Sequence, residues 1–376
     1  MTATFRWMTG ILMVMALVLT GCSKSSDGDE QAQSSSQSSE NTSNQQASEG
    51  KTTTWRFALE EVDGSVQDAY ATEFKKRVEE ASGGKIKVEI YPYGSLGTSS
   101  QLTELVQSGA LELAFASPGH LASVIPSVGV FTLHFVLSDD NKVNEKVLNS
   151  KAVHDILADP YHQQGLELMS IVPEGWMVWT ANKPLRSPAD FDGFKMRTMT
   201  SPILVESYKA YGANPTPKPY SQVYSGLQLG EIDGQVNPVF AIEEMSFYEE
   251  QDYMIFAKHA QFVSTFVAGQ EWYNGLPEDQ RKIVDKVTEE LVPWIFEKQA
   301  EYNDQRLQKI EEAGGTKVIY LTDEERDKFR KASMKVRDTY IEQAGETGKK
   351  LLDTITSEVD KYEKEMKGEE ESKDES

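Results

Sequence analysis

Hydrophobic and polar positions follow a regular order through residues 54–116. The pattern predicts, in sequence, a strand, a helix, a strand, a helix and a strand, at residues 54–59, 66–81, 86–90, 102–106 and 111–116. Ile86, Val88 and Ile90, for example, alternate with charged residues, which is the period of a half-buried strand. Strands that alternate with helices over short connections are typical of a parallel, doubly wound α/β sheet.

Ligands of such sheets bind in the loops beyond the carboxyl ends of the strands. In this chain, those loops contain Glu60-Glu61, Tyr93-Gly94-Ser95 and Ser117-Pro118. We therefore expect ligand contacts at these three loops, with Glu60 and Ser117 as candidate ligand-binding residues.

A second group of elements begins near Trp176. The pattern predicts strands at residues 178–181 and 194–199, and helices at residues 202–211 and 221–229. Ser221 is the expected N-cap of the last of these helices. Beyond Pro277 the chain is mostly amphipathic helix, interrupted by a short predicted strand at residues 317–320.

Arg197 lies at the end of one predicted strand of this second group. Phe194 and Met196 alternate with Lys195 and Arg197, which directs Arg197 away from the core side of the strand. An arginine in such a position is often solvated. A guanidinium group at the end of a strand is also well suited to bind a carboxylate through two parallel hydrogen bonds. The pattern alone leaves both interpretations open.

The N-terminal residues differ in composition from the rest of the chain. Residues 1–21 contain a basic start, an apolar run and the sequence Leu-Thr-Gly before Cys22, as in a lipoprotein signal peptide. The apolar run spans roughly 14 Å as a helix, which is too short for a hydrocarbon core of about 30 Å. Acylation of Cys22 would anchor the protein at a membrane outside the cytoplasm. The alternative is an ordinary secretory signal with a chance cysteine. Residues 23–51 are polar and predict a disordered linker.

Charge and cysteine content exclude several classes of partner and site. Sixty acidic and 38 basic residues give a net charge of −22, which disfavours nucleic acid as a partner. Cys22 is the single cysteine, so neither an intrachain disulfide nor a cysteine metal site is possible. The five histidines show no zinc-binding spacing, and no phosphate loop or nucleophile motif is present. We expect no metal, no cofactor and no catalytic activity, and a disordered acidic tail at residues 366–376.

Four segments of the second half resemble the solute-binding proteins of tripartite ATP-independent periplasmic (TRAP) transporters. They occur in the order and spacing of that family, at residues 187–197, 212–217, 224–230 and 233–238. The resemblance extends over residues 52–360. It implies a periplasmic-binding-protein-like fold, in which two α/β domains are joined by crossing strands and a long helix, with the ligand cleft between them. The expected domains are residues 52–174 with 263–302, and residues 175–262 with 303–365.

The resemblance also implies a function. A protein of this family captures a small organic acid outside the cytoplasm and delivers it to the TRAP membrane permease, and we expect it to be a monomer. Two alternatives remain open on the sequence. One is a sensory protein that presents its ligand to a receptor, and the other is a surface-anchored enzyme, for which the sequence supplies no nucleophile or metal set.

By the same resemblance, Arg197 pairs with the ligand carboxylate and Asn237 forms a hydrogen bond with it. Other candidate ligand-binding residues are polar, aromatic or thioether side chains of the same region: Gln222, Gln235, Trp176, Met177, Tyr220, Tyr224, Phe240 and Phe262.

Two positions depart from the family pattern. Gln222 stands where a glutamate is common, and Met177 stands where many members have a second arginine. A second carboxylate beside Met177 would lie unpaired in a desolvated cleft. We therefore predict a monocarboxylate with a neutral or apolar remainder over a dicarboxylate. The alternative is that Lys218 or Lys183 supplies the second positive charge.

Overall fold

The computed structural model describes residues 52–374 of the 376-residue chain. The predicted signal peptide, Cys22 and the predicted linker lie outside these residues. Of the helices that are described, none combines the length and the apolar character needed to cross a lipid bilayer.

The first domain has the predicted order of strands and helices. Its elements are β1 (Thr53–Ala58), α1 (Val66–Ala81), β2 (Ile86–Tyr91), α2 (Ser99–Gln107) and β3 (Leu113–Ala116). β1 lies between β2 and β3 and pairs with both in parallel. Helix α1 begins after Ser65, whose side chain accepts a hydrogen bond from the backbone N–H of Asp68. The parallel α/β prediction is thus confirmed for these three strands.

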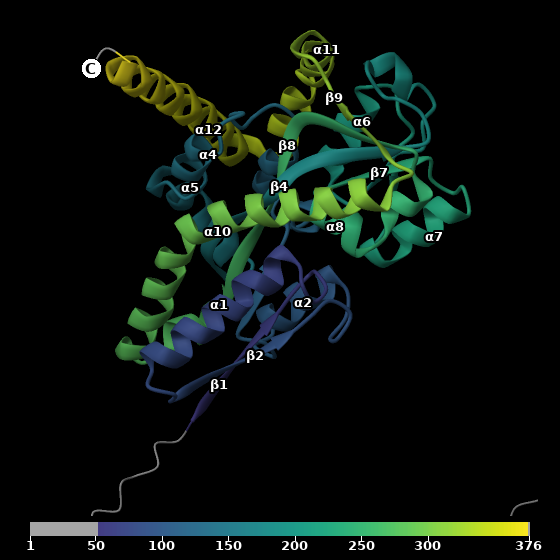
Figure 1. Cartoon of the computed structure of the whole chain (residues 1–376). Coiled ribbons are helices and arrows are strands. Elements are labelled where there is room, and N and C mark those ends of the chain that lie inside the picture. The colour runs from purple at the N-terminus through teal and green to yellow at the C-terminus, as the bar shows by residue number, and fades with distance from the viewer. Residues whose placement is uncertain (1–51, 375–376) are drawn as a thin grey trace, which may run out of the picture. The chain divides into compact units, whose positions relative to one another are not determined.

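Two long strands connect the first domain to the second (Figure 1). β4 (Leu166–Ala181) and β8 (Tyr253–Gly269) pair with each other in antiparallel orientation along nearly their whole lengths. β3 of the first domain pairs with one end of β8, and β7 (Gly234–Asn237) of the second domain pairs with the opposite part of β4. The sheet order is therefore β2-β1-β3-β8-β4-β7, which is mixed, and the predicted crossing strands are confirmed.

The second domain differs from its sequence prediction in two places. The strand expected at residues 194–199 is reduced to β5 (Arg197–Thr198), because the backbone N–H of Phe194 bonds to Phe191 in a turn. The helix expected from Ser221 begins later, as α7 (Val223–Gln228), after a 3₁₀ turn at Tyr220–Gln222. Ser221 is therefore not its N-cap. The remaining elements of this region are η2 (Pro188–Phe191), α6 (Pro202–Lys209), β6 (Thr216–Pro217), α8 (Val239–Glu244) and η4 (Phe247–Glu250).

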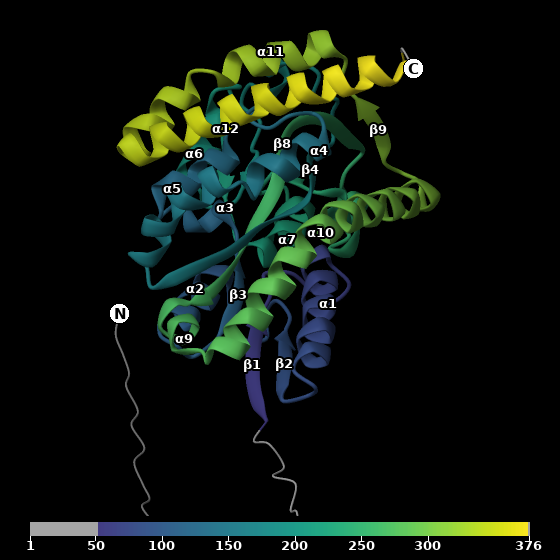
Figure 2. The ribbon, with the colours of Figure 1, turned by 90° about the vertical axis from the view of Figure 1, so that its left-hand side faces the viewer.

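Helix α10 (Glu278–Ala313) contacts both domains, as the predicted long helix should (Figure 2). It packs on α1 of the first domain, on β4 and on α8 of the second domain. Pro293 lies inside it and removes one helical hydrogen bond, and the helix bends in Figure 1. β9 (Lys317–Tyr320) pairs in parallel with β8, so that predicted strand is also confirmed. The other elements are α3 (Pro118–Leu121), η1 (Pro126–Thr132), α4 (Asn141–Leu148), α5 (Lys151–His162), α9 (Gln270–Gly275) and α11 (Asp323–Ser333).

The C-terminal segment differs from the predicted disordered tail. Helix α12 (Val336–Asp374) continues through residues 366–374, with one break at Gly345, where φ is 62°. Glutamate, lysine and methionine dominate this segment, and all three have high helix propensity. A polar segment that cannot form a hydrophobic core can therefore still be helical when it continues a helix whose earlier turns are packed against the protein.

Candidate functional site

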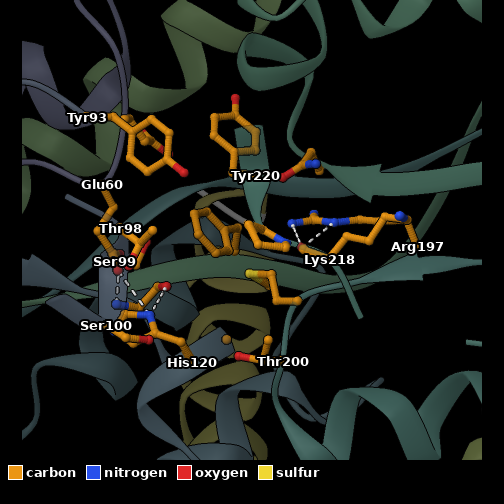
Figure 3. A pocket seen from close by; sticks show the side chains of 17 residues that line it. Glu60, Tyr93, Thr98, Ser99, Ser100, His120, Arg197, Thr200, Lys218 and Tyr220 are labelled. Carbon is orange, nitrogen blue, oxygen red and sulfur yellow. Dashed lines mark hydrogen bonds and ion pairs between the residues drawn. The ribbon is translucent and has the colours of Figure 1, made fainter. Parts of the chain in front are cut away.

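A pocket of about 180 Å³ lies where the loops of the first domain meet the second domain (Figure 3). Its lining includes side chains from both domains: Glu60, Glu61, Tyr93, Thr98, Ser99, Ser100, Ser117, Gly119, His120, Arg197, Met199, Thr200, Lys218, Pro219, Tyr220, Asn237 and Phe262. Since the parallel strands β1, β2 and β3 end at one edge of the sheet, the loops that follow them converge there. All three loops that the sequence selected contribute to the pocket.

Glu60 is held in the first-domain wall by three contacts. Its Oε2 accepts a hydrogen bond of 2.8 Å from the backbone N–H of Ser117, and its Oε1 lies 3.0 Å from Nδ1 of His120. Its own backbone N–H donates to Oε1 of Gln67 at 2.8 Å. Burial, with a further contribution from the carboxylate of Glu174, raises the pKa of Glu60 to about 8. This carboxyl group is therefore largely protonated at neutral pH in the unliganded pocket.

Glu61 and Glu174 form a second pair of buried carboxyl groups behind the same wall. Gln67 Nε2 donates to Glu174 Oε1 at 3.0 Å and to Ser264 Oγ at 3.1 Å, and the Gln67 backbone N–H donates to Glu61 Oε2 at 3.4 Å. Burial and the nearby charge of Glu174 raise the pKa of Glu61 well above its usual value. The first-domain side of the pocket is thus an acidic side, in which burial and mutual repulsion favour bound protons.

Arg197 enters the pocket from the second domain, opposite Glu60 (Figure 3). Its Nε and Nη2 donate to the backbone carbonyl of Lys218, at 3.1 and 2.7 Å. Its Nη1 is buried and has no hydrogen-bond partner among the described residues. Burial lowers the pKa of Arg197 to about 10, so the guanidinium stays charged at neutral pH. The solvated interpretation of this arginine is wrong, because only 2% of the residue is exposed.

Lys218 lies in the same wall but its charge is already paired. Its Nζ lies 2.6 Å from Oε2 of Glu231. The alternative in which Lys218 takes a second ligand charge would therefore require this ion pair to break or to be shared.

Aromatic rings form the uncharged walls between the two sides. Tyr93 of the first domain contacts Tyr220 of the second edge-to-face, with ring centroids 5.9 Å apart. The Tyr220 hydroxyl donates to Oε1 of Glu244 at 3.1 Å. Phe262 of the crossing strand β8 adds a third ring to the lining. These rings bring the two domains into contact around the pocket.

Six of the twelve ligand-binding residues selected from the sequence line this pocket: Glu60, Ser117, Arg197, Tyr220, Asn237 and Phe262. Gln235 lies one step behind them, where its Oε1 accepts a hydrogen bond from Nδ2 of Asn237 and its Nε2 donates to Thr180 Oγ1 at 3.1 Å. Gln235 therefore orients Asn237 from outside the pocket.

The other five do not line the pocket. Met177 and Trp176 border smaller neighbouring cavities of about 20 and 10 Å³. Phe240 is fully buried in the main hydrophobic core, because α8 packs that face against α10. Gln222 is exposed and Tyr224 is half-buried, since the late start of α7 turns both away from the pocket.

The sequence analysis did not select several pocket residues. The most important of these is His120, because it is titratable and contacts Glu60. It lies in α3, directly after β3, so the rule for strand ends could have been extended by one helical turn to find it. Thr98, Ser99 and Ser100 start α2 in the same way after β2. Gly119 and Met199 meet across the pocket, which only the packing of the two domains reveals.

The arrangement is suited to bind a small molecule that carries a carboxylate. The unpartnered Nη1 of Arg197 supplies a charged donor in a desolvated place, where such a bond is strong. Across the described residues 52–374, histidine, aspartate and glutamate side chains form no group of three that could hold a metal ion.

Comparisons with known proteins agree with this geometry. The sequence profile of the bacterial extracellular solute-binding protein family 7 matches residues 57–343. The ectoine-binding periplasmic protein TeaA of Halomonas elongata is 39% identical over 84% of this chain and 92% of its own length. The ectoine/5-hydroxyectoine-binding periplasmic protein of Ruegeria pomeroyi is 37% identical over 81% of this chain and 90% of its own.

Solved structures show the same relationship. A TRAP periplasmic solute-binding protein from Marinobacter aquaeolei VT8, in an open form without ligand, matches with a TM-score of 0.78 and 48% identity. That match covers 81% of this chain and 99% of the other. The structure of the ectoine-binding protein of Halomonas elongata matches with a TM-score of 0.79 and 38% identity, over 82% and 99% of the two chains. This chain therefore belongs to the family 7 solute-binding proteins and is an extracytoplasmic solute-binding protein of the TRAP type.

Proposed function

We propose that this protein captures a small zwitterionic monocarboxylate of the ectoine type and delivers it to a TRAP permease. The observation that carries the proposal is the opposition of Arg197 to Glu60 and Glu61 across one pocket. A ligand carboxylate fits Nη1 of Arg197, and a delocalised ligand cation fits the acidic side and the aromatic rings. Ectoine has both groups on one small ring.

The size and charge of the pocket favour this class over others. Its volume of about 180 Å³ is below the roughly 300–1,000 Å³ of sites for drug-sized ligands, so the ligand is a small metabolite. A dicarboxylate would bury its second carboxylate beside Glu60 and Glu61, on a side of the pocket that offers it no positively charged partner. The preference for a monocarboxylate therefore no longer needs Met177. The remainder of the ligand is proposed to be cationic, which differs from the neutral or apolar remainder inferred from sequence.

The two relatives named for ectoine support the same class of ligand. Other relatives are named for C4-dicarboxylates, but at 26–30% identity. The proposal is therefore supported both by the more similar relatives and by the arrangement of charged groups in the pocket.

A thermal-shift screen of the purified mature protein tests the proposal. Ectoine at 100 times its dissociation constant should stabilise the protein by about 2.7 kcal/mol. Succinate and malate serve as the dicarboxylate comparison and should produce little shift. Strong stabilisation by these dicarboxylates, with none by ectoine, would contradict the proposed ligand class.

We propose further that the protein is anchored by acyl chains on Cys22 and acts as a monomer without catalytic activity. The lipobox sequence before Cys22 supports the anchor. Metabolic labelling with a fatty acid should mark the wild type and leave a Cys22→Ala variant unlabelled. Light scattering should give the mass of one chain, and ectoine recovered after prolonged incubation should be chemically unchanged. A dimer mass or a converted ligand would contradict the corresponding part.

A further inference from the structure

Glu60 and His120 form a buried contact in the first-domain wall of the pocket. Glu60 Oε1 and His120 Nδ1 are 3.0 Å apart, and the two side chains are 4% and 11% exposed. Both residues line the cavity, on the side opposite Arg197 (Figure 3). A ligand in the pocket can therefore contact a pair that bulk water barely reaches.

Hydroxyl groups hold the His120 ring at both nitrogens. Ser117 Oγ lies 3.2 Å from Nδ1, and Thr103 Oγ1 lies 3.2 Å from Nε2. A hydroxyl group can donate or accept a hydrogen bond, so Nε2 keeps a partner in either neutral tautomer. Without moving, His120 can thus present either a lone pair or an N–H to Glu60.

The surroundings favour uncharged forms of both groups. Burial and Glu174 raise the pKa of Glu60 to about 8, and burial lowers the pKa of His120 to about 4. At pH 7 the unliganded pair therefore holds one proton on Glu60, which donates to Nδ1. Several titratable or charged groups face the pair. They lie in the loop after β1, the loop after β2, β4, β5, the residue after β6 and the 3₁₀ turn at Tyr220–Gln222: Glu61, Tyr93, Glu174, Arg197, Lys218 and Tyr220.

We propose that this pair exchanges a proton for the cationic group of the ligand, and that His120 is the positioning residue that stabilises Glu60 in both protonation states. The inference rests on the proposed function, because it requires a ligand cation beside Glu60. On binding, Glu60 gives its proton to Nδ1, and Nε2 loses its proton to water by way of the Thr103 hydroxyl. Glu60 then carries a full negative charge and accepts a hydrogen bond from Nδ1–H. One proton is released for each ligand bound.

This exchange makes ligand affinity depend on pH. Below about pH 8 each bound ligand must displace a proton, so affinity rises about tenfold per pH unit. Above that pH the proton is already absent, and affinity levels off. The change in slope distinguishes proton exchange from simple charge attraction, which would leave affinity nearly constant over this range.

Calorimetric titration with ectoine, at several pH values between 6 and 9, tests the exchange. Repeating the pH 6.5 titration in buffers of different ionisation enthalpy should show release of about one proton per ligand. Glu60→Gln should abolish both the proton release and the pH dependence. Wild-type affinity that is constant from pH 6 to pH 8 would overturn the inference while leaving the proposed function intact.

Variants of His120 separate positioning from a structural role. His120→Phe removes the N–H that stabilises ionised Glu60, so the rise in affinity should move to higher pH, with a loss of about 10–100-fold at pH 7. His120→Gln, whose amide can donate or accept, should retain more of the affinity at pH 7. His162→Gln, on α5 and outside the pocket, is the matched control and should leave the profile unchanged. An equal loss at every pH in His120→Phe would show that the ring only supports the fold.

Infrared spectroscopy of the unliganded protein checks the proton directly. The carbonyl stretch of a protonated carboxyl group should be present at pH 7 and should decrease in Glu60→Gln. If the two spectra match in this region, Glu60 holds no proton and the inference is wrong whatever the ligand is. If ectoine binds at none of the pH values tested, the proposed function is wrong. The proton exchange with this ligand is then wrong as well, even if the infrared spectrum shows a protonated Glu60.

Discussion

The two sides of the pocket carry ionisable groups of opposite type, and burial affects the ionisation of the two types differently. On the second-domain side, Arg197 keeps its charge although it is buried, because burial lowers its high pKa only to about 10; the Lys218 carbonyl accepts two of its hydrogen bonds. On the first-domain side, Glu60 and Glu61 lie among other carboxyl groups, and their raised pKa values favour bound protons. The attraction for a carboxylate therefore exists before the ligand arrives, whereas the attraction for a cation develops as it binds.

The largest expected effect comes from removing the charge of the second-domain side. Arg197→Ala should weaken ligand binding by about 3–5 kcal/mol, because the ligand carboxylate would be buried without a partner. Arg197→Lys should also bind poorly, since one ammonium group does not reproduce the planar guanidinium. Calorimetric titration measures both effects. Arg186→Ala, an exposed arginine of the same domain, is the control, and near wild-type affinity in folded Arg197→Ala would refute the assignment.

The second prediction concerns the stability of the acidic side without ligand. Glu60 has a higher pKa in the folded state than in the unfolded state, so its contribution to stability is present below about pH 4.5 and is lost as pH rises toward 8. Glu60→Gln should therefore be more stable than wild type at pH 8, by a few kcal/mol, and about equal at pH 4. Chemical denaturation at the two pH values measures this difference. Exposed Glu324→Gln is the control, and a variant that is less stable at pH 8 would contradict the prediction.

The third prediction tests the contact that joins the two sides. A Cβ added at Gly119 would crowd Sδ, Cε and Cβ of Met199, so Gly119→Ala should weaken the contact between the two domains beside the pocket. Crowding of this kind costs about 1–3 kcal/mol, which predicts weaker binding of about 5- to 150-fold. Affinity measurements should show the loss in Gly119→Ala and a partial recovery when Met199→Ala is added. Gly275→Ala, with nothing within 4 Å of the new Cβ, should bind normally.

The smallest expected effect concerns a hydrogen bond beside Arg197. Tyr220→Phe keeps the ring contact with Tyr93 but removes the hydroxyl that donates to Glu244. Burial raises the pKa of Glu244 to about 8, so the lost bond involves a largely uncharged carboxyl group. Thermal denaturation at pH 7 should show a loss of about 1 kcal/mol. A loss of stability several times larger would mean that Glu244 is charged at pH 7. The carboxyl groups near the pocket would then hold fewer protons than proposed, and the two sides of the pocket would differ less.

Local patterns in the sequence located the three loops on the first-domain side of the pocket, but not His120 or the residues at the start of α2. Glu60 and Ser117 follow parallel strands, and the position of a strand end determines which edge of the sheet its loop reaches. The burial of Arg197 was not predictable in that way. Alternation indicates that Arg197 and Met196 occupy opposite faces, but it does not show that the first domain covers the face of Arg197.

Errors elsewhere arose where tertiary contacts decide the outcome. Tyr224 and Gln222 lie in or next to a helix whose start shifted by two residues, and this shift is enough to turn a side chain from one helix face to another. Phe240 was selected because aromatic residues suit cleft walls, yet packing against α10 places it in the core. The family resemblance supplied the fold and the expected role of Arg197, whereas the contact of Glu60 with His120 depends on how the loops after β1 and β3 pack together.

The crossing strand β8 has a consequence for the order in which the protein assembles. Phe266 of β8 packs against Phe57, Phe74 and Phe115, so it completes the aromatic core of the first domain from a position about 150 residues or more further along the chain. An emerging chain that ends before residue 266 lacks both this ring and the strand that borders β3. The first domain is then unable to close its core during synthesis, and the chain remains loosely structured until β8 has appeared. Such a delay is compatible with export as an unfolded chain, followed by folding of both domains together on the far side of the membrane.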